Sequence, residues 1–175
     1  MSSKAKSTII NAFLELVETE DFDKITVTSL VEKCNISRQT FYYHFNDIDE
    51  MLKYSFETET KAICDEQIVG SWYDSAEIYV DFLNRYDTLL RKAAATSKFI
   101  FIYDLLFNSF DTYIKDYTEK KKGRPTASTG NSKFLVDYTA AAFCGLVIIE
   151  LQKEKSDYQT LLIHIAKSFK TLPKT

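Results

Sequence analysis

The densest group of hydrogen-bonding side chains in this sequence lies between residues 37 and 44. In a helix, Phe41 and Phe45 are four residues apart, so they share one face and are expected to point inward. The opposite face then presents an amide and two phenols, those of Gln39, Tyr42 and Tyr43. Exposed aromatic rings beside donors, with no acid between residues 37 and 45, suit contact with the phosphates and base edges of duplex DNA.

Other chemistries have little support. The sequence has no glycine-rich loop to cradle a phosphate, no evident Ser-His-Asp order and no predictably paired carboxylates, so we expect neither an enzyme nor a cofactor. Cys34, Cys64 and Cys144 lie far apart among helical apolar residues, which indicates buried free thiols. Because His44 and His164 are the only histidines, a zinc site would need scattered ligands, and no metal is expected.

The residues around this polar segment are typical of a helix-turn-helix. Thr26 suits the cap of a first short helix, and Ser37 suits the cap of a second. The apolar face of the first helix consists of Leu30, Val31 and Cys34. Asn35 tolerates the left-handed conformation that a helix stop requires. Residues 26–45 are therefore predicted to form two short helices joined by a tight turn.

A longer pattern surrounds this segment, and it consists of Phe22, Lys24-Ile25-Thr26-Val27, Ile36-Ser37, Thr40-Phe41-Tyr42-Tyr43-His44-Phe45, Asp47 and Leu52. With this pattern, residues 7–51 resemble the DNA-binding domain of the TetR family of bacterial transcription regulators. The resemblance covers about a quarter of the chain, and the remainder is similar only in length and helical character. Two positions depart from the family. Asn35 stands where the turn commonly has Gly, and Ile48 replaces a Lys that often meets a phosphate, so that contact is not carried over.

The resemblance implies a homodimer that places one copy of residues 37–44 in each of two major grooves of a palindromic double-stranded DNA operator. It also implies the full set of DNA-binding residues, namely Thr28, Ser37, Arg38, Gln39, Thr40, Tyr42, Tyr43 and His44. Of these, Arg38, Gln39, Thr40 and Tyr42 are expected near base edges, and Tyr43 and His44 near phosphates. The working description is a repressor, although the sign of regulation depends on where the operator lies relative to the promoter.

The charge balance is unusual for a DNA-binding protein. The net charge is −3, and the first 60 residues hold 6 Lys and Arg against 11 Asp and Glu. Most of these acids fall at the end of the first predicted helix and on the fourth, away from the expected DNA-facing side. Phosphate contact requires local positive potential rather than a basic whole protein. We therefore expect a monomer of low affinity that depends on dimerisation.

The whole chain is predicted to be all-α, because only 4 Gly and 2 Pro interrupt 175 residues. Residues 1–46 are expected to form a three-helix DNA-binding domain, in which the first helix covers about Ser7 to Thr19. A long fourth helix leads into residues 47–175, a helical domain for dimerisation and for binding a ligand or partner. Its expected helices cover 75–86 with a short segment near Leu89-Leu90, then 99–117, 133–155 and 157–172, with a loop at 119–133. The total is about nine helices.

Aromatic side chains are concentrated in the C-terminal part. Seven of them lie on helices expected to surround the bundle interior and are the predicted lining of an effector cavity: Phe82, Tyr86, Tyr103, Phe107, Phe110, Tyr138 and Phe143. A small molecule bound there would shift the fourth helix and change the separation of the two DNA-reading helices. The alternative is a protein partner, because the short aromatic domain resembles the branch of dihydroxyacetone-kinase operon activators, which answer to a partner protein. A closed cavity favours the ligand, and an absent one favours the partner.

The last two predicted helices carry more apolar surface than one side of a small bundle needs. Their expected dimer contacts are Ala141, Ala142, Gly145, Ile148, Ile149, Leu161, Ile165 and Phe169. The resemblance likewise implies that these helices pair with their symmetry mates in a four-helix bundle. The longest purely apolar run, 140–149, is too short to span a bilayer, and no signal peptide is evident. We therefore expect a cytoplasmic protein without membrane contact.

Overall fold

The computed structural model describes residues 2–66, 72–122 and 130–171, and these ranges contain helices and turns but no strand. The elements are α1 (Ser2–Thr19), η1 (Phe22–Lys24, a 3-10 turn), α2 (Val27–Cys34), α3 (Arg38–His44), α4 (Ile48–Glu66), α5 (Trp72–Ala94), α6 (Phe99–Lys122), α7 (Gly130–Leu151) and α8 (Tyr158–Thr171). The predicted all-α class is confirmed. The described part has eight α-helices and one 3-10 turn, against the nine or so expected.

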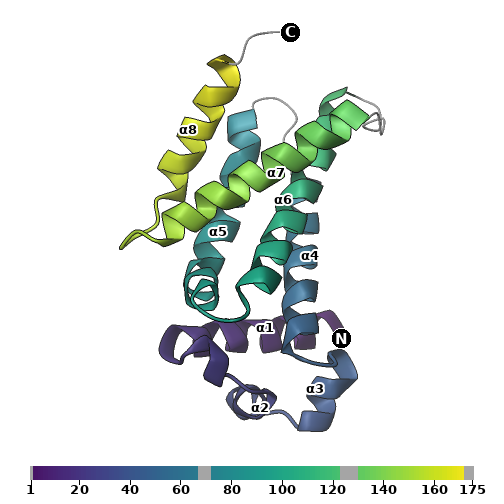
Figure 1. The fold of residues 1–175 in the computed structure, drawn as a ribbon. Helices are drawn as coiled ribbons and strands as arrows, with labels where there is room; N and C mark the ends of the chain where they lie inside the picture. Colours follow the sequence, from purple (N-terminus) through teal and green to yellow (C-terminus); the bar gives the residue numbers. More distant parts are fainter. Residues whose placement is uncertain (1, 67–71, 123–129, 172–175) are drawn as a thin grey trace.

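The first three α-helices gather at one end of the molecule, and α4 rises from them into the bundle (Figure 1). α1 lies across this end and buries Ile9, Phe13 and Val17 on one face. Leu30 of α2 and Phe41 of α3, neither of which has exposed surface, are buried in the same apolar cluster. Burial of this apolar surface stabilises the small N-terminal layer and fixes α3 relative to α1.

Local hydrogen bonds define the turn between α2 and α3. Thr26 and Ser29 form a capping box, in which the Ser29 N–H donates to Thr26 Oγ1 at 3.2 Å and the Thr26 N–H donates to Ser29 Oγ at 3.0 Å. Asn35 ends α2 in the left-handed region, with φ 53° and ψ 46°. The N–H of Ile36 then donates to the Val31 carbonyl at 3.0 Å. The predicted cap at Thr26 and the predicted stop at Asn35 are confirmed.

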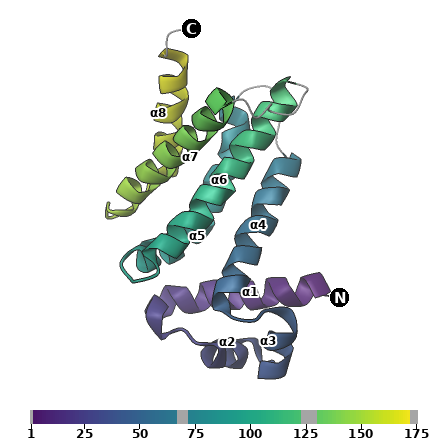
Figure 2. The same ribbon diagram turned by 45° about the vertical axis from the view of Figure 1, so that its right-hand side comes forward.

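The helices α4 to α8 form the C-terminal bundle. α4 and α6 run side by side and α8 packs against α5 (Figure 2). α7 crosses α5 and α6 (Figure 1). Aromatic rings fill the interior, among them Tyr79 and Phe82 of α5, Phe110 of α6 and Phe143 of α7, all of them buried. α4 therefore belongs to both parts of the molecule, because it packs near α1 at its start and along α6 farther on.

Several helix boundaries differ from the prediction. α5 continues to Ala94 rather than ending near Tyr86, because Leu89, Leu90 and Ala93 extend its buried stripe without a Gly or Pro to stop it. α1 begins at Ser2 rather than near Ser7. α6 reaches Lys122 and α7 starts at Gly130, so both ends of the predicted loop 119–133 are helical, and its residues 123–129 lie outside the described residues.

Basic side chains of the bundle hold both the N-terminal layer and the first turn of α4 in place. The Lys92 ammonium of α5 donates to the carbonyls of Val17 at 2.6 Å and Glu20 at 2.9 Å, and so satisfies acceptors that the end of α1 leaves open. Arg85 of α5 donates to Asn11 Oδ1 of α1 at 2.8 Å. Lys98, which precedes α6, pairs with Asp49 in the first turn of α4. α5 is thus a second connection beside α4.

α7 is unusually apolar. Its stretch Lys133–Leu151 is the one span in the described helices that is long and apolar enough to cross a membrane by length and composition, which the estimate from residues 140–149 had missed. One side of this stretch, which includes Val136, Ala140 and Val147, is buried inside the protein. A helix that is partly buried in a protein core passes the same test of composition, so its apolarity does not indicate a membrane span.

Candidate DNA-binding surface and effector sites

α3 separates its side chains into an anchored face and an open face. Phe41 and Phe45 are buried, with ring centroids 5.9 Å apart. On the other side, Tyr42 is 56% exposed and Tyr43 is 81% exposed, and Gln39 is exposed beside them. This arrangement follows from the four-residue spacing of the two phenylalanines. The rings of Tyr42 and Tyr43 are therefore available to an external partner, while the helix stays fixed by its buried side.

The start of α3 carries most of the predicted contacts. The N–H of Thr40 donates to Ser37 Oγ at 3.0 Å, and the hydroxyls of Ser37 and Thr40 form a hydrogen bond at 2.9 Å. Arg38 donates from Nη2 to Thr28 Oγ1 on α2 at 2.6 Å. His44, half-buried at the end of α3, packs edge-on against Tyr43 at 5.0 Å. The structure thus brings all eight predicted DNA-contact residues to one region of α2 and α3.

Most other cations near this surface already have partners. Lys33 pairs with Glu15 at 3.0 Å, and Lys24 pairs with Asp21 at 2.7 Å. Lys6 lies over the ring of Tyr54, with Nζ 3.9 Å from its centroid. Arg38 is the one Lys or Arg within α3. Positive charge on the exposed face of α3 is therefore concentrated at Arg38.

The predicted aromatic cavity is filled by the rings themselves. The rings of Phe110 and Phe143 stack with centroids 3.6 Å apart, and Tyr79 meets Phe143 edge-on at 5.5 Å. The space left among these rings is about 10 Å³, which is room for about one water molecule. Phe82 and Tyr86 are buried in the same core. These side chains close the interior rather than line an effector cavity, and this corrects the prediction.

The remaining predicted lining residues lie outside that core. Tyr103 and Phe107 are half-buried on α6 and stack on each other at 6.3 Å. Tyr138 is 62% exposed on α7, where it stacks with Phe134 at 6.1 Å. Tyr138 therefore faces away from the bundle interior. α7 is apolar on all sides, so its periodicity contained no signal that could have placed Tyr138 on the outer face.

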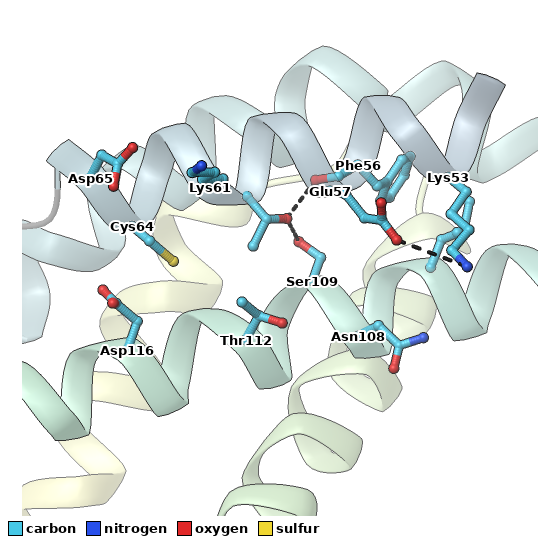
Figure 3. A pocket seen from close by; sticks show the side chains of 12 residues that line it. Lys53, Phe56, Glu57, Lys61, Cys64, Asp65, Asn108, Ser109, Thr112 and Asp116 are labelled. Atoms are coloured by element: carbon cyan, nitrogen blue, oxygen red, sulfur yellow. Dashed lines mark hydrogen bonds and ion pairs between the residues drawn. The ribbon is translucent and has the colours of Figure 1, made fainter. Parts of the chain in front are cut away.

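A groove between α4 and α6 has the size of a ligand site, with a volume of about 650 Å³ (Figure 3). Its lining consists of Lys53, Phe56, Glu57, Thr60, Lys61, Cys64, Asp65, Leu105, Asn108, Ser109, Thr112 and Asp116. At its wall the hydroxyls of Thr60 and Ser109 are hydrogen-bonded at 2.6 Å, and Tyr79 donates to Ser109 at 2.9 Å. Burial raises the pKa of the Cys64 thiol to about 11, so it is a neutral thiol at physiological pH.

Sequence reasoning missed this groove. Lys53, Glu57, Lys61 and Asp65 recur every four residues along α4, and such a charged row is usually a solvated helix face. The groove exists because α6 lies along that row at a distance that leaves space between the side chains. No feature of α4 alone indicates this pairing, since it depends on tertiary packing.

Tyr86 belongs to a polar network between α4 and α5. Its hydroxyl donates to Glu59 Oε1 at 2.8 Å and shares a hydrogen bond of 2.5 Å with Ser55. Arg85, which also contacts Asn11, lies 3.6 Å from the Glu59 carboxylate. Burial raises the pKa of Glu59, while Tyr86 and Arg85 act in the opposite direction. The Tyr86 hydroxyl is thus engaged in holding α4 against α5.

The outer face of α7 forms a continuous apolar stripe. Its exposed members are Phe134, Leu135, Tyr138, Ala141, Ala142, Gly145, Leu146 and Ile149. Ile149 is 57% exposed, and a Cβ placed on Gly145 would meet no atom within 4 Å. Of the other predicted dimer contacts, Ile148, Leu161 and Ile165 are half-buried, and the side chain of Phe169 lies outside the described residues.

A polar cluster sets the turn between α7 and α8. Arg91 of α5 donates to the carbonyl of Lys153 at 2.6 Å and to Ser156 Oγ at 2.7 Å. Asp87 accepts from Ser156 at 2.5 Å and from Tyr158 at 2.6 Å. These contacts satisfy acceptors beyond the end of α7 and fix the direction in which α8 returns. The outer surfaces of α7 and α8 are therefore held in one orientation.

The cysteines and acids form no evident metal centre. Cys64 and Cys144 are buried and Cys34 is half-buried, and all three are free thiols. Within the described ranges, no group of three or more His, Cys, Asp or Glu side chains is arranged to hold a metal ion. Cys34 differs from the prediction, because part of its side chain reaches the surface.

The helix-turn-helix and the bundle joined to it by α4 define a class of protein. Residues 9–54 match the family described as "Bacterial regulatory proteins, tetR family". This chain therefore carries, at its N-terminal end, the DNA-binding domain of the TetR family of transcription regulators.

Two known proteins are similar to this chain over nearly its whole length. The chain is similar to the HTH-type dhaKLM operon transcriptional activator DhaS of Lactococcus lactis subsp. lactis (strain IL1403), at 27% identity over 179 aligned positions that cover 93% of this chain and 91% of the relative. A solved structure titled "Dihydroxyacetone kinase operon activator DhaS" has a TM-score of 0.73 at 17% identity, over 97% of this chain and 98% of that one. The second likeness concerns the fold alone. Together they confirm the resemblance to that activator branch.

Proposed function

We propose that the protein binds a two-fold related duplex site as a homodimer and reads it with the exposed face of α3. The observation that carries this proposal is the division of α3. Its donor-bearing and aromatic side chains face outward on a helix that Phe41 and Phe45 anchor from behind. A recognition helix needs both properties, because base edges are read by projecting side chains on a rigid support.

The apolar stripe on α7 supports the homodimer. An exposed patch of this kind marks an interaction site, and a two-fold interface buries the same patch on both subunits. The small residues Ala141, Ala142 and Gly145 permit close approach of a second helix. The dimer also compensates for the low DNA affinity expected of an acidic N-terminal layer, because two weakly binding recognition helices act together on one site.

The test is selection of binding sites from randomised duplex DNA with the purified protein. We expect a pair of inverted half-sites whose centres are about one helical turn, or a multiple of it, apart. Equal affinity for selected and random duplex at moderate salt contradicts the proposal. A selected site without two-fold symmetry contradicts the homodimer but leaves the DNA-binding function standing.

Control by an effector belongs to the C-terminal bundle. A small molecule in the groove between α4 and α6 is the first candidate, because the groove has suitable volume and α4 leads directly to the N-terminal layer. A protein partner is the second, and the filled aromatic interior favours it. Activation is the proposed sign of regulation, because the lactococcal relative is named an activator.

A groove-filling variant separates the two candidates. Thr112→Phe adds a ring to the exposed α6 side of the groove, and Asp104→Phe adds the same ring at an exposed α6 position outside its lining. Compounds that raise the melting temperature of the wild-type protein in a metabolite screen should do so for Asp104→Phe and not for Thr112→Phe. If no compound stabilises the wild type, and its operator affinity changes only when a co-purifying protein is present, the protein partner is favoured.

A further inference from the structure

The single cation of α3 occupies the position from which base reading begins. Arg38 is the first residue of the helix, it is exposed, and no other Lys or Arg follows it as far as His44. Recognition helices contact base edges mainly with their N-terminal residues. Arg38 is therefore the source of the positive charge that α3 would place in the major groove of DNA.

Other hydroxyls at this end of α3 are already engaged. Ser37 and Thr40 are hydrogen-bonded to each other at 2.9 Å, and Ser37 also receives the N–H of Thr40 as the helix cap. Their capacity to discriminate between bases is reduced accordingly. Arg38 also differs from these residues in geometry, because two parallel N–H groups of a guanidinium match the O6 and N7 acceptors of guanine.

The Arg38 guanidinium is held from the side by α2. Its Nη2 donates to Thr28 Oγ1 at 2.6 Å, a contact that links two helices across the turn. Thr28 stands in the first turn of α2, and the capping box of Thr26 and Ser29 fixes that turn. Because a hydroxyl is a neutral acceptor, Thr28 orients the guanidinium without neutralising its charge. The other donors of the group remain available for two contacts to one base.

We propose that Thr28 is a positioning residue that holds Arg38 in the orientation with which it reads one guanine in each half-site. The inference rests on the proposed function, since it requires α3 in the major groove. It adds a base identity, a residue that reads it and a residue on another helix that sets the geometry. Thr28 then contributes to specificity without touching the base.

The experiment measures the affinity of the dimer for its selected site and for duplexes with each single base replaced. The wild type should prefer guanine at one position per half-site by about 5- to 150-fold, which corresponds to a good bidentate pair. Arg38→Ala should bring the ratio of affinities for guanine and the other bases at that position close to one. Thr28→Val, which removes the hydroxyl and keeps the shape, should reduce it several-fold at the same position. Thr28→Ser, which keeps the hydroxyl, should stay within about twofold of the wild type.

Two further arms decide between this role and the alternatives. In an Arg38→Ala background, Thr28→Val should leave base preference unchanged, because the residue acts through Arg38. If Thr28→Val lowers affinity equally for all bases, Thr28 holds a phosphate and the proposal is wrong. It is also wrong if Arg38→Ala changes preference at no position. If the wild type selects no site, the proposed function itself fails. Thr28→Ala is the second hydroxyl-free variant if circular dichroism finds Thr28→Val unfolded.

Discussion

The outer faces of α3 and α7 both leave large apolar side chains in contact with solvent, yet they differ in what lies between those side chains. On α3, Tyr42 and Tyr43 stand among an amide, a guanidinium and hydroxyls. On α7, the exposed residues from 134 to 149 are aliphatic, aromatic or Gly, without one charge. Exposure alone therefore does not identify a partner. Interleaved donors suit a polyanion with polar base edges, whereas an uninterrupted apolar stripe suits another apolar surface.

The largest effect is expected where the α7 face receives a charge. Gly145→Glu places one carboxylate in each subunit of a two-fold seam, where both are desolvated without a partner. We expect monomers or aggregates and no operator binding, although every α3 residue is unchanged. Sedimentation and gel-shift measurements check this. Asn84→Glu, which adds the same charge at an exposed position of α5, should remain dimeric. A dimeric Gly145→Glu that still binds DNA would move the interface elsewhere.

Salt should affect the two faces differently. Raising salt from about 50 to 200 mM should weaken DNA binding by about 10³ to 10⁵ if 6 to 10 phosphates are contacted, because bound counterions are released on association. The dimer, held mainly by apolar burial, should change little over the same range. Fluorescence anisotropy with labelled duplex and sedimentation equilibrium give the two dependences. A dimer that dissociates in parallel with the loss of DNA binding would contradict the difference between the faces.

Substitutions on the open side of α3 should alter recognition but not folding. Tyr42→Ala or Gln39→Ala should cost roughly 1–3 kcal/mol of binding free energy or abolish sequence preference, with little change in unfolding free energy. Phe41→Ala, on the anchored side, should instead lower the free energy of unfolding by about 3–5 kcal/mol. Chemical denaturation and binding assays on all three variants provide the check. Unfolding of Tyr42→Ala would mean that its ring belongs to the core.

The smallest effect concerns Tyr138, which sequence reasoning assigned to an effector cavity. Tyr138→Ser should change the unfolding free energy of the monomer by no more than about 0.5 kcal/mol, because the ring is exposed. It should weaken the dimer by about 1 kcal/mol or more, as loss of an interface aromatic does. Ile100→Ser, at an exposed apolar position on α6, is the control without effect on the dimer. If Tyr138→Ser changes the binding of an effector but not dimerisation, Tyr138 belongs to an effector site as the sequence predicted.

Local signals explain which features were predictable from the sequence. Thr26, Ser37 and Asn35 define helix ends through contacts within a few residues, and Phe41 and Phe45 define a face by spacing alone, so α2 and α3 matched expectation. α7 gave no such guidance, since Tyr138 and Phe143 stand in the same apolar surroundings in the sequence and only packing separates outside from inside. The α4–α6 groove was hidden for the opposite reason, because a charged row on one helix gives no information about its neighbour.

The way α1 ends has a consequence for protein engineering. Three carbonyls at and just beyond its end, those of Val17, Glu18 and Glu20, accept from the ammonium of Lys92, which comes from the bundle. Grafting the N-terminal layer onto the C-terminal bundle of another regulator would leave those acceptors without their ammonium donor. A working chimaera therefore has to import Lys92 and the part of α5 that presents it, or supply a Lys at the equivalent place in the recipient core.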